Sequence, residues 1–581
     1  IDPPRGSNSL PSIFTYGGGG LHANWLPIYA DPNDKFSTGL SVTVAKPYSA
    51  ISNGKLVEER QNSDGSRTFR WLQELPHSNY LIALFVGDYD SVRFRPAFGT
   101  IPITCWAPRG SKEEARYAFR NTTEMVESFS KRFNYRYPWD KYDQVAAYDY
   151  AIGAMENTSI TGHRESVLRN PSAPDDFDPH LEAYASNWTA EATISHELAH
   201  HWFGDNLTCR SLASIWLNES FATYCMMLWD EHRMGQEYLQ FQTWLALQAY
   251  LRYVEKERLI RPMEYRRYDS REEIYNEEHT YLKGGILLNM LRWILGDEDF
   301  FRAMSYYLHK HQFSNVESTD LEIAIQEATG RNLDWFFDQW VYGGGHPRFE
   351  VSYEYYADRK ALELTVKQTQ PLVEGQGLFE LPVEIRIDTK SKTMLDTVWV
   401  EHETDHFSLK VDENPQMVSF DGRGALIKDL IFEKNPDELI YQLLHDQLPG
   451  RLWALHQLVQ RYPSKPQILE AIRFSLGSNA SWWLKAEATL QLQHIHTPAG
   501  EQLLLQQLEA NDYHIRKAAA IALGSHFTKA SSEALRKSIE TDDQADVVAA
   551  AILSLAKIDT SLTPRFFKDQ ISQHCWYDEL R

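Results

Sequence analysis

Two histidines spaced for one face of a helix are the first residues in this sequence that could do chemistry. Residues 193–204 contain the pattern H-E-x-x-H at His196, Glu197 and His200, and neither Pro nor Gly interrupts the segment before Gly204. An α-helix has about 3.6 residues per turn, so side chains four positions apart lie on the same face. The two imidazoles are therefore expected to bind one metal ion, with Glu197 beside them as a candidate general base.

A third metal ligand is available on the next helical segment. Eighteen residues separate His200 from Glu219, which is surrounded by the apolar residues Ile215, Leu217 and Phe221. Two antiparallel helices joined by a loop would bring this carboxylate to the histidines. A His-His-Glu set with one position left open for water is typical of catalytic zinc sites. Nitrogen and oxygen ligands suit Zn²⁺, although other divalent metals could substitute.

Further motifs carry a family resemblance. G-A-M-E-N stands at residues 153–157, and together with H-E-x-x-H and the glutamate at this spacing it resembles the M1 family of zinc aminopeptidases, which are gluzincins. The resemblance covers roughly residues 10–430 and continues through Tyr137-Pro-Trp-Asp-Lys-Tyr-Asp143, His201-Trp-Phe-Gly204 and Tyr281-Leu-Lys-Gly284. It implies one zinc ion per chain, a thermolysin-like catalytic domain and peptide substrates with a free N-terminus.

The metal ligands and the base have distinct expected roles. His196, His200 and Glu219 are expected to hold the zinc ion, which lowers the pKa of a bound water to about 7. Glu197 is expected to take a proton from that water and to pass it to the leaving amine.

Two other roles depend on the resemblance. The Y-x-K-G motif identifies Tyr281 as the phenol that stabilises the transition state by a hydrogen bond to the tetrahedral oxygen; without the resemblance a tyrosine is more often a packing residue. Glu156, a carboxylate expected beside the zinc, would bind the substrate's free α-amine, while the neighbouring backbone would hold the peptide as an added strand. The expected substrate-binding residues are Gly153, Ala154, Met155, Glu156 and Asn157.

One position departs from the family's pattern. Members usually carry a second amine-binding acid in a Q-x-E segment of the N-terminal domain, and Gly18 aligns with that acid here. We therefore expect a preference for free N-termini that is weaker than with two carboxylates. We also expect Gly18→Glu to lower the KM for substrates with a free amine.

The predicted function is hydrolysis of the N-terminal peptide bond by a zinc metallo-aminopeptidase. One alternative is a related zinc hydrolase that uses the same site, either an epoxide-opening or an endo-acting enzyme. An aminopeptidase would differ from it in that turnover depends on a free amine in the substrate. Another is a scaffold that binds through its C-terminal helices and keeps a vestigial site. The intact ligands, base and tyrosine favour an enzyme, because a vestigial site has no chemical need for all five.

The composition and charge of the chain limit the kinds of partner and the locations that are expected. The 581 residues carry a formal net charge of −22 at pH 7, which repels phosphate backbones, so no nucleic-acid partner is expected. No run of 18 apolar residues occurs, so no membrane span is expected. No signal peptide is visible, and the first residue is Ile1. The expected protein is soluble, and a cytoplasmic, periplasmic or secreted location stays open. The sequence does not indicate the oligomeric state. Free, mostly buried thiols are expected at Cys105, Cys209, Cys225 and Cys575, because no C-x-x-C pair occurs.

Four domains are expected to position these residues. Alternating and apolar runs such as Leu40–Ala45 and Tyr80–Val86 predict strands in residues 1–100, and the resemblance identifies a partial N-terminal β-sandwich there. A small sheet beside a helical bundle is expected in residues 101–343, the thermolysin-like α/β catalytic domain. Alternation returns in residues 344–434 and predicts a second β-sandwich.

The fourth expected domain, residues 435–581, is repetitive. Four triplets recur at spacings of 34, 31 and 32 residues: Arg451…Ala454…Leu458, Lys485…Ala488…Leu492, Arg516…Ala519…Leu523 and Val548…Ala551…Leu555. Each lies in an apolar helical segment followed by a second one, which is typical of a HEAT-like α-solenoid. The predicted fold class is therefore multidomain, with α/β, all-β and all-α parts in one chain.

Overall fold

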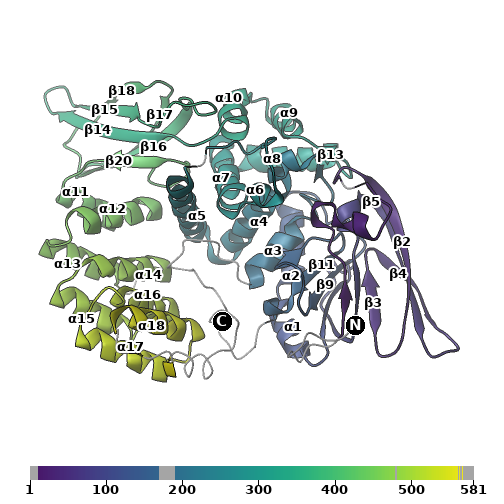
Figure 1. The fold of residues 1–581 in the computed structure, drawn as a ribbon. Helices are drawn as coiled ribbons and strands as arrows, with labels where there is room; N and C mark the ends of the chain where they lie inside the picture. The colour runs from purple at the N-terminus through teal and green to yellow at the C-terminus, as the bar shows by residue number, and fades with distance from the viewer. Residues whose placement is uncertain are drawn as a thin grey trace.

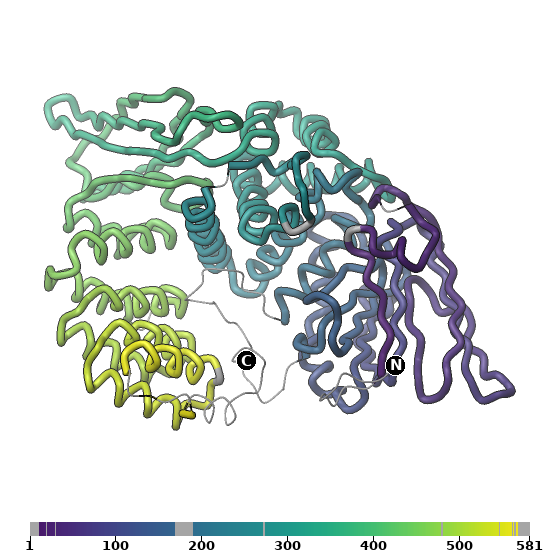
Figure 2. The backbone as a smooth tube through the Cα atoms, in the orientation of Figure 1, coloured from purple at the N-terminus to yellow at the C-terminus, as the bar shows by residue number. Residues whose placement is uncertain are grey.

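The protein is built from four successive parts that form an open arch (Figure 1). The structure is a computed structural model that describes residues 11–29, 31–168, 190–258, 260–477, 480–559, 562, 565 and 566. The tube in Figure 2 places the N-terminal strands at one end of the arch and the last helices at the other. This succession of β, α/β, β and α parts confirms the predicted multidomain fold class.

Two three-stranded sheets make up the first part. One has the order β2-β5-β4 and the other β1-β6-β3. The sheets enclose a shared apolar core that includes Phe69 and Trp71 from one sheet and Ile51 and Phe85 from the other, so this part is a small β-sandwich. The strands are β1 (Ile13–Phe14), β2 (Lys35–Val44), β3 (Ser49–Ser52), β4 (Lys55–Gln61), β5 (Arg67–Ser78) and β6 (Leu84–Gly87).

A five-stranded sheet opens the central part. Its order is β10-β11-β9-β8-β7, so the strand that carries the middle of G-A-M-E-N lies at one edge. The strands are β7 (Tyr89–Arg93), β8 (Ile103–Pro108), β9 (Tyr142–Ala147), β10 (Ala154–Met155) and β11 (Ile160–Arg164). Because β7 pairs with β8, we propose that the domain boundary expected at residue 100 lies before Tyr89.

Helices complete the central part. The helix α4 packs against α3, α5 and α7, and it ends at Gly235, whose φ of 88° is one that residues with a side chain rarely adopt. The α-helices are α1 (Lys112–Ala118), α2 (Thr122–Arg132), α3 (Ala190–Ala199), α4 (Trp216–Met234), α5 (Gln236–Glu257), α6 (Arg271–Ile274), α7 (Gly284–Leu295), α8 (Asp297–Lys310), α9 (Ser318–Thr329) and α10 (Asp334–Phe337). Two π-helices, η5 (Glu277–Lys283) and η6 (Asp338–Tyr342), and a short strand pair, β12 (Thr208–Cys209) with β13 (Asn315–Val316), join them.

A second β-sandwich follows η6. Its sheets have the orders β18-β15-β14-β20 and β17-β16-β19. The strands alternate buried and exposed residues, as the sequence predicted for a sandwich with one solvent-facing side per sheet. They are β14 (Arg348–Tyr356), β15 (Ala361–Gln368), β16 (Leu381–Asp388), β17 (Thr393–Val400), β18 (Thr404–Lys410), β19 (Met417–Phe420) and β20 (Asp429–Phe432).

The C-terminal part is a helical solenoid. The four predicted triplets fall on α12, α14, α16 and α18, except that Leu492 begins the short 3-10 helix η7 (Leu492–His494) directly after α14. Each of these four α-helices packs on the next, which confirms the repeat. Prolines begin α11, α13 and α15, where a helix does not need the missing N–H. The helices are α11 (Pro436–His445), α12 (Leu448–Arg461), α13 (Pro466–Ser475), α14 (Trp482–Gln491), α15 (Pro498–Gln507), α16 (Tyr513–Leu523), α17 (Lys529–Thr541) and α18 (Ala545–Ile558).

The structure bears on the predictions made for the cysteines and for membrane spans. Cys105, Cys209 and Cys225 are free and buried, as predicted, whereas Cys575 lies outside the described residues. Over the described ranges, no helix has both the length and the apolar character needed to cross a bilayer.

Candidate active site

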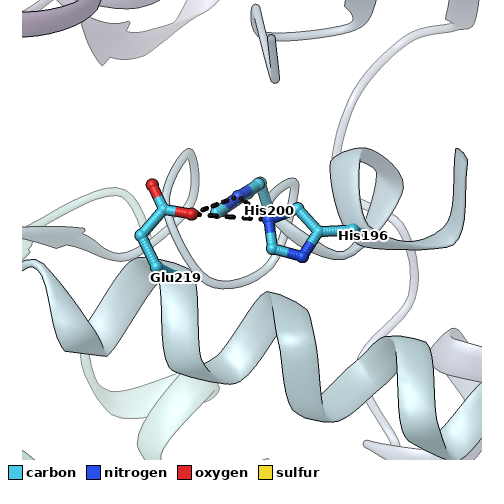
Figure 3. A group of neighbouring side chains, drawn as sticks. All are labelled: His196, His200 and Glu219. Atoms are coloured by element: carbon cyan, nitrogen blue, oxygen red, sulfur yellow. Dashed lines mark hydrogen bonds and ion pairs between the residues drawn. The ribbon is translucent and has the colours of Figure 1, made fainter. Parts of the chain in front are cut away.

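The three predicted metal ligands converge from two packed helices. His196 and His200 lie on and just after α3, and Glu219 lies in the first turn of α4 (Figure 3). The Nε2 atoms of the histidines are 3.1 Å apart, and the Glu219 Oε2 atom lies 3.4 Å from His196 Nε2 and 3.3 Å from His200 Nε2. Ligands bound tetrahedrally at about 2.0–2.1 Å from one ion are themselves separated by roughly 3.3 Å. The donor set therefore fits a zinc ion in both its chemistry and its spacing.

The surroundings of His200 orient its ring for this purpose. His200 Nδ1 donates to the carbonyl of Phe203 at 3.0 Å, which directs Nε2 toward the other two predicted ligands. The chain turns sharply here: Gly204 has a φ of 144°, and a Cβ on it would lie 2.9 Å from His200 Nδ1. Gly204 therefore leaves the space that the ligand ring occupies.

Burial and charge favour the metal-binding forms of His196 and Glu219. Burial lowers the pKa of His196 to about 4, so its imidazole is neutral near pH 7. Burial by itself would raise the pKa of Glu219, but the imidazoles of His200 and His196 outweigh it and lower that pKa to about 2. A neutral histidine and an ionised glutamate are the forms that bind a metal. For His200, burial lowers the pKa but the carboxylates of Glu219 and Glu156 outweigh it and raise the pKa, so a metal ion would displace a proton there.

Glu197 and Glu156 form a second group around His200. The carboxylate oxygens of both residues and a ring nitrogen of His200 lie within 4.8 Å of one another, and all three residues are buried. Among the described residues, Glu197 Oε2 has no hydrogen-bond partner. Burial raises the pKa of Glu197, and the nearby Glu156 carboxylate raises it further, whereas the charge of His200 opposes the shift. A buried carboxylate oxygen without a partner is costly, so its position beside the candidate metal site calls for a function.

The G-A-M-E-N segment lies along an open sheet edge. In β10, Ala154 pairs with His163 and Met155 with Gly162 of β11, and no strand covers the other side of β10 among the described residues. At Gly153 no atom lies within 4 Å of the place that a Cβ would take. An extended peptide can therefore add to this edge by backbone hydrogen bonds.

Hydrogen bonds connect the N-terminal sandwich to the end of the G-A-M-E-N segment. Asn53 Nδ2 donates to the carbonyls of Thr158 at 2.7 Å and Leu81 at 3.0 Å. Asn157, which is fully buried, donates to the carbonyls of Leu81 and Ile82, each at 3.4 Å. The side chain of Asn157 thus contacts the backbone of the N-terminal sandwich, and its substrate-binding role stays a prediction.

Tyr281 reaches the site from the π-helix η5. Its ring stacks on the ring of His196, with 5.8 Å between centroids and 25° between planes. Ser220 follows the predicted ligand Glu219, and its Oγ donates to the carbonyl of Thr280 at 2.7 Å. A Cβ on Gly284 would lie 1.9 Å from Ser220 Oγ. The glycine of Y-x-K-G therefore permits the close approach of η5 to α4. Burial and the charge of Glu219 raise the pKa of Tyr281, so its phenol is a neutral hydrogen-bond donor.

The sequence analysis gave His201 no role. Its Nε2 accepts the backbone N–H of Ser159 at 3.0 Å, and its ring stacks on Tyr137 with 5.4 Å between centroids. Burial lowers the pKa of His201 to about 3, which keeps the ring neutral and able to accept this bond. His201 thereby connects α3 to the end of the G-A-M-E-N segment; the only signal in the sequence was the doubled histidine after H-E-x-x-H.

The structure shows what a side chain at Gly18 would meet. A Cβ on Gly18 would lie 2.2 Å from the hydroxyl oxygen of Tyr16 and 2.5 Å from its Cζ. A glutamate at this position would therefore displace the ring of Tyr16 before it could reach an amine. The lower KM expected for Gly18→Glu stays a prediction, and it requires that the Tyr16 ring move aside.

Comparison with known families assigns two regions of the chain. Residues 117–340 match the peptidase family M1 domain, and residues 469–556 match HEAT repeats. The first region contains both histidines, Glu219, G-A-M-E-N and Tyr281.

Several characterised proteins are similar to this chain. Aminopeptidase M1-A of Oryza sativa subsp. japonica is 29% identical over 372 residues, which are 62% of this chain and 40% of that protein. Leucyl aminopeptidase of Saccharolobus solfataricus is 28% identical over 426 residues, 72% of this chain and 52% of the relative. The chain thus spans about half or less of the length of these curated relatives.

A solved structure shares the fold. The crystal structure of Legionella pneumophila aminopeptidase A in complex with aspartic acid superposes with a TM-score of 0.68 at 19% sequence identity, over 94% of this chain and 65% of that one.

Proposed function

Because the chain carries a peptidase family M1 domain followed by HEAT repeats, we propose that it is a zinc aminopeptidase that removes N-terminal residues from peptides. The observation that carries the proposal is the set of three ligand atoms spaced 3.1–3.4 Å apart, with the unpartnered Glu197 carboxylate beside them. His196, His200 and Glu219 would hold the ion. A zinc ion at this place acts as a Lewis acid that activates water and polarises the scissile carbonyl.

The remaining residues divide the work of hydrolysis. Glu197 accepts the proton of the attacking water and later delivers it to the leaving amine. Tyr281, whose ring stacks on His196, donates a hydrogen bond from its phenol. The acceptor is the carbonyl oxygen of the substrate, which gains negative charge as the carbonyl is attacked. The open edge of β10 binds the substrate backbone, with Gly153, Ala154 and Met155 as its partners.

Glu156 makes the reaction an N-terminal one in this proposal. It lies next to His200, directly after β10, and is buried. A buried carboxylate at this place favours a substrate that brings a cation, and the free α-ammonium of a peptide is that cation. Asn157 is assigned to fastening the segment, because its amide contacts the carbonyls of Leu81 and Ile82.

Turnover of matched substrates tests the proposal. A panel of aminoacyl-aminomethylcoumarins should be hydrolysed by the purified protein, and their N-acetylated forms should be cleaved far more slowly. The protein should contain about one zinc per chain, and Glu219→Ala should lower zinc content and turnover together. Equal cleavage of free and acetylated substrates would favour an endo-acting hydrolase, and a metal-free protein without turnover would favour a binding scaffold.

A further inference from the structure

A tyrosine from the N-terminal sandwich contacts the carboxylate that we assign to the substrate amine. Tyr80 lies in the turn η2 (Asn79–Leu81), between β5 and β6. Its hydroxyl donates to Glu156 Oε1 at 3.1 Å. In the described part of the chain, it is the only side chain that donates a hydrogen bond to Glu156. Tyr80 belongs to the apolar run that the sequence analysis interpreted only as a strand.

The same hydroxyl is fixed from the side of the metal ligands. Asn218, which directly precedes Glu219, donates from Nδ2 to the Tyr80 hydroxyl oxygen at 3.3 Å. Its Oδ1 atom accepts the backbone N–H of Cys209 at 3.1 Å, so the amide has a defined orientation. Because Asn218 supplies the hydrogen that the Tyr80 oxygen accepts, the phenolic hydrogen is directed to Glu156. The order of donors is therefore Asn218, Tyr80 and then Glu156.

The three side chains of this hydrogen-bonded series are buried. The exposed fractions are 8% for Tyr80, 1% for Asn218 and 7% for Glu156. Water has little access to these groups, so a lost hydrogen bond would not be replaced at little cost. The turn itself is held in place, since Asn53 and Asn157 both donate to the carbonyl of Leu81.

We propose that Tyr80 is a positioning residue for recognition of the substrate's N-terminus. Its hydroxyl, oriented by Asn218, holds one oxygen of Glu156 so that the carboxylate keeps a fixed position beside the metal site, with the other oxygen turned to the α-ammonium. This couples the amine-binding residue to the segment that carries Glu219. The inference rests on the proposed role of Glu156, and it assigns Tyr80 a role in binding and none in the chemical step.

Removal of the hydroxyl tests the inference. In Tyr80→Phe, the KM for an aminoacyl-aminomethylcoumarin should rise about two- to tenfold, the ratio that corresponds to the net free energy of one hydrogen bond. Its kcat should stay within about twofold, since the groups that carry out the chemical step are unchanged. The preference for the free over the N-acetylated substrate should fall by the same factor as the KM rises.

A matched control separates this role from the general loss of a buried hydroxyl. Tyr150 is fully buried, and its hydroxyl has no hydrogen-bond partner among the described residues. Tyr150→Phe should leave KM, kcat and the preference for free amines unchanged. Melting temperature and zinc content of each variant show that it is folded and loaded.

A double-mutant cycle decides whether Tyr80 acts through Glu156. In the Glu156→Ala background, Tyr80→Phe should add no further loss of affinity for the free amine. Losses that multiply in the double variant, or an unchanged KM in Tyr80→Phe alone, would overturn the inference while leaving the function of Glu156 intact. If Glu156→Ala itself keeps the wild-type KM and the preference for free amines, both the proposed role of Glu156 and the inference fail.

Discussion

At the scale of single residues, Glu197 differs from the three proposed ligands in its contacts. Its Oε2 atom has no hydrogen-bond partner among the described residues, whereas Glu219 Oε2 lies within 3.4 Å of both histidines. Glu197 lies instead in the neighbouring group, with Glu156 and His200. These contacts support the proposal that Glu219 holds the metal and that Glu197 is the base.

We therefore expect Glu197→Gln to abolish turnover without releasing the metal. The amide keeps the shape of the side chain but cannot accept a proton, so kcat should fall by at least about 10²-fold. Zinc content, measured by plasma mass spectrometry, should stay at the wild-type level. The same substitution at Glu191, on the first turn of the same helix, should leave kcat unchanged. Wild-type turnover of Glu197→Gln would exclude Glu197 as the base.

At the scale of elements, the close approach of η5 to α4 determines where Tyr281 lies. A Cβ on Gly284 would come within 1.9 Å of Ser220 Oγ and 2.4 Å of Ser220 Cβ. Ser220 Cβ is attached directly to the backbone of α4, and Ser220 Oγ is held by its bond to the Thr280 carbonyl at 2.7 Å. We therefore expect a methyl group added at Gly284, the first residue of α7, to push α4 away from η5 and α7. Since Ser220 follows Glu219 directly, such a shift would move Tyr281 relative to the ligand set.

Gly284→Ala is accordingly expected to reduce kcat by about 10² or more, the loss that accompanies removal of an oxyanion donor, and to lower the melting temperature. Ser220→Gly in the same chain removes both clashing atoms and should restore part of the activity. Gly285→Ala is the matched control: its Cβ would meet Thr223 Cγ2 at 3.1 Å and Met227 Cε at 3.4 Å, which are side-chain ends. A fully active Gly284→Ala would show that the helix spacing does not limit catalysis.

The ion pair between Glu127 on α2 and Arg95 makes a contribution to stability that depends on pH. Glu127 on α2 accepts two bonds from the Arg95 guanidinium, at 2.7 and 3.1 Å, and one from the backbone N–H of Phe98 at 2.9 Å. The bond from Arg95 lowers the pKa of Glu127 from 4.5 to about 2. Because the folded state holds the carboxylate ionised, this contact stabilises the fold above the unfolded pKa, and the stabilisation is lost as the pH falls from 4.5 to about 2.

Glu127→Gln should therefore lower the free energy of unfolding at pH 7 by about 1 kcal/mol, since Arg95 is exposed and solvent screens the pair. The difference from wild type should persist at pH 5 and shrink below about pH 4. Urea unfolding at several pH values measures it. Glu124→Gln on the exposed side of the same helix should give a smaller difference at pH 7. A difference for Glu127→Gln that grew on acidification would contradict the assignment.

At the scale of the whole molecule, α5 links the catalytic part to the solenoid (Figure 1). Tyr238, Phe241 and Trp244 of α5 share one apolar cluster with Leu452 of α12 and Trp483 of α14. At the start of α5, Glu237 accepts bonds from Trp483 Nε1 at 3.1 Å and from Ser481 Oγ at 2.9 Å. The solenoid is thus anchored by an apolar contact with a polar rim.

Trp483→Ala should loosen this anchor. The loss of a large buried aromatic side chain typically costs about 3–5 kcal/mol, and here it falls on the contact between two parts that have separate cores. Calorimetry should show an early transition for the solenoid, followed by a second one for the catalytic part. Phe527→Ala is the control, because that side chain is 75% exposed. A single unchanged transition in Trp483→Ala would mean that the two parts do not unfold separately.

Local patterns in the sequence determined much of this protein. The four-residue spacing of His196 and His200 needs only a helix to form one side of a metal site. The triplets spaced 31 to 34 residues apart needed only helix packing to become the stacked α12, α14, α16 and α18. Both features depend on the regular geometry of one element or one repeat, and a single sequence displays that geometry directly.

The tertiary structure alone decided the contacts between distant segments. Tyr80 and Glu156 lie 76 residues apart, and Asn218 lies 138 residues after Tyr80. The same holds for the contact between Ser220 and Gly284. No periodicity relates such residues, because their distance in space depends on how sheets and helices pack and not on their separation along the chain. For this reason the sequence predicted the candidate metal ligands, and only the fold showed which distant side chains contact Glu156 and the segment that carries Tyr281.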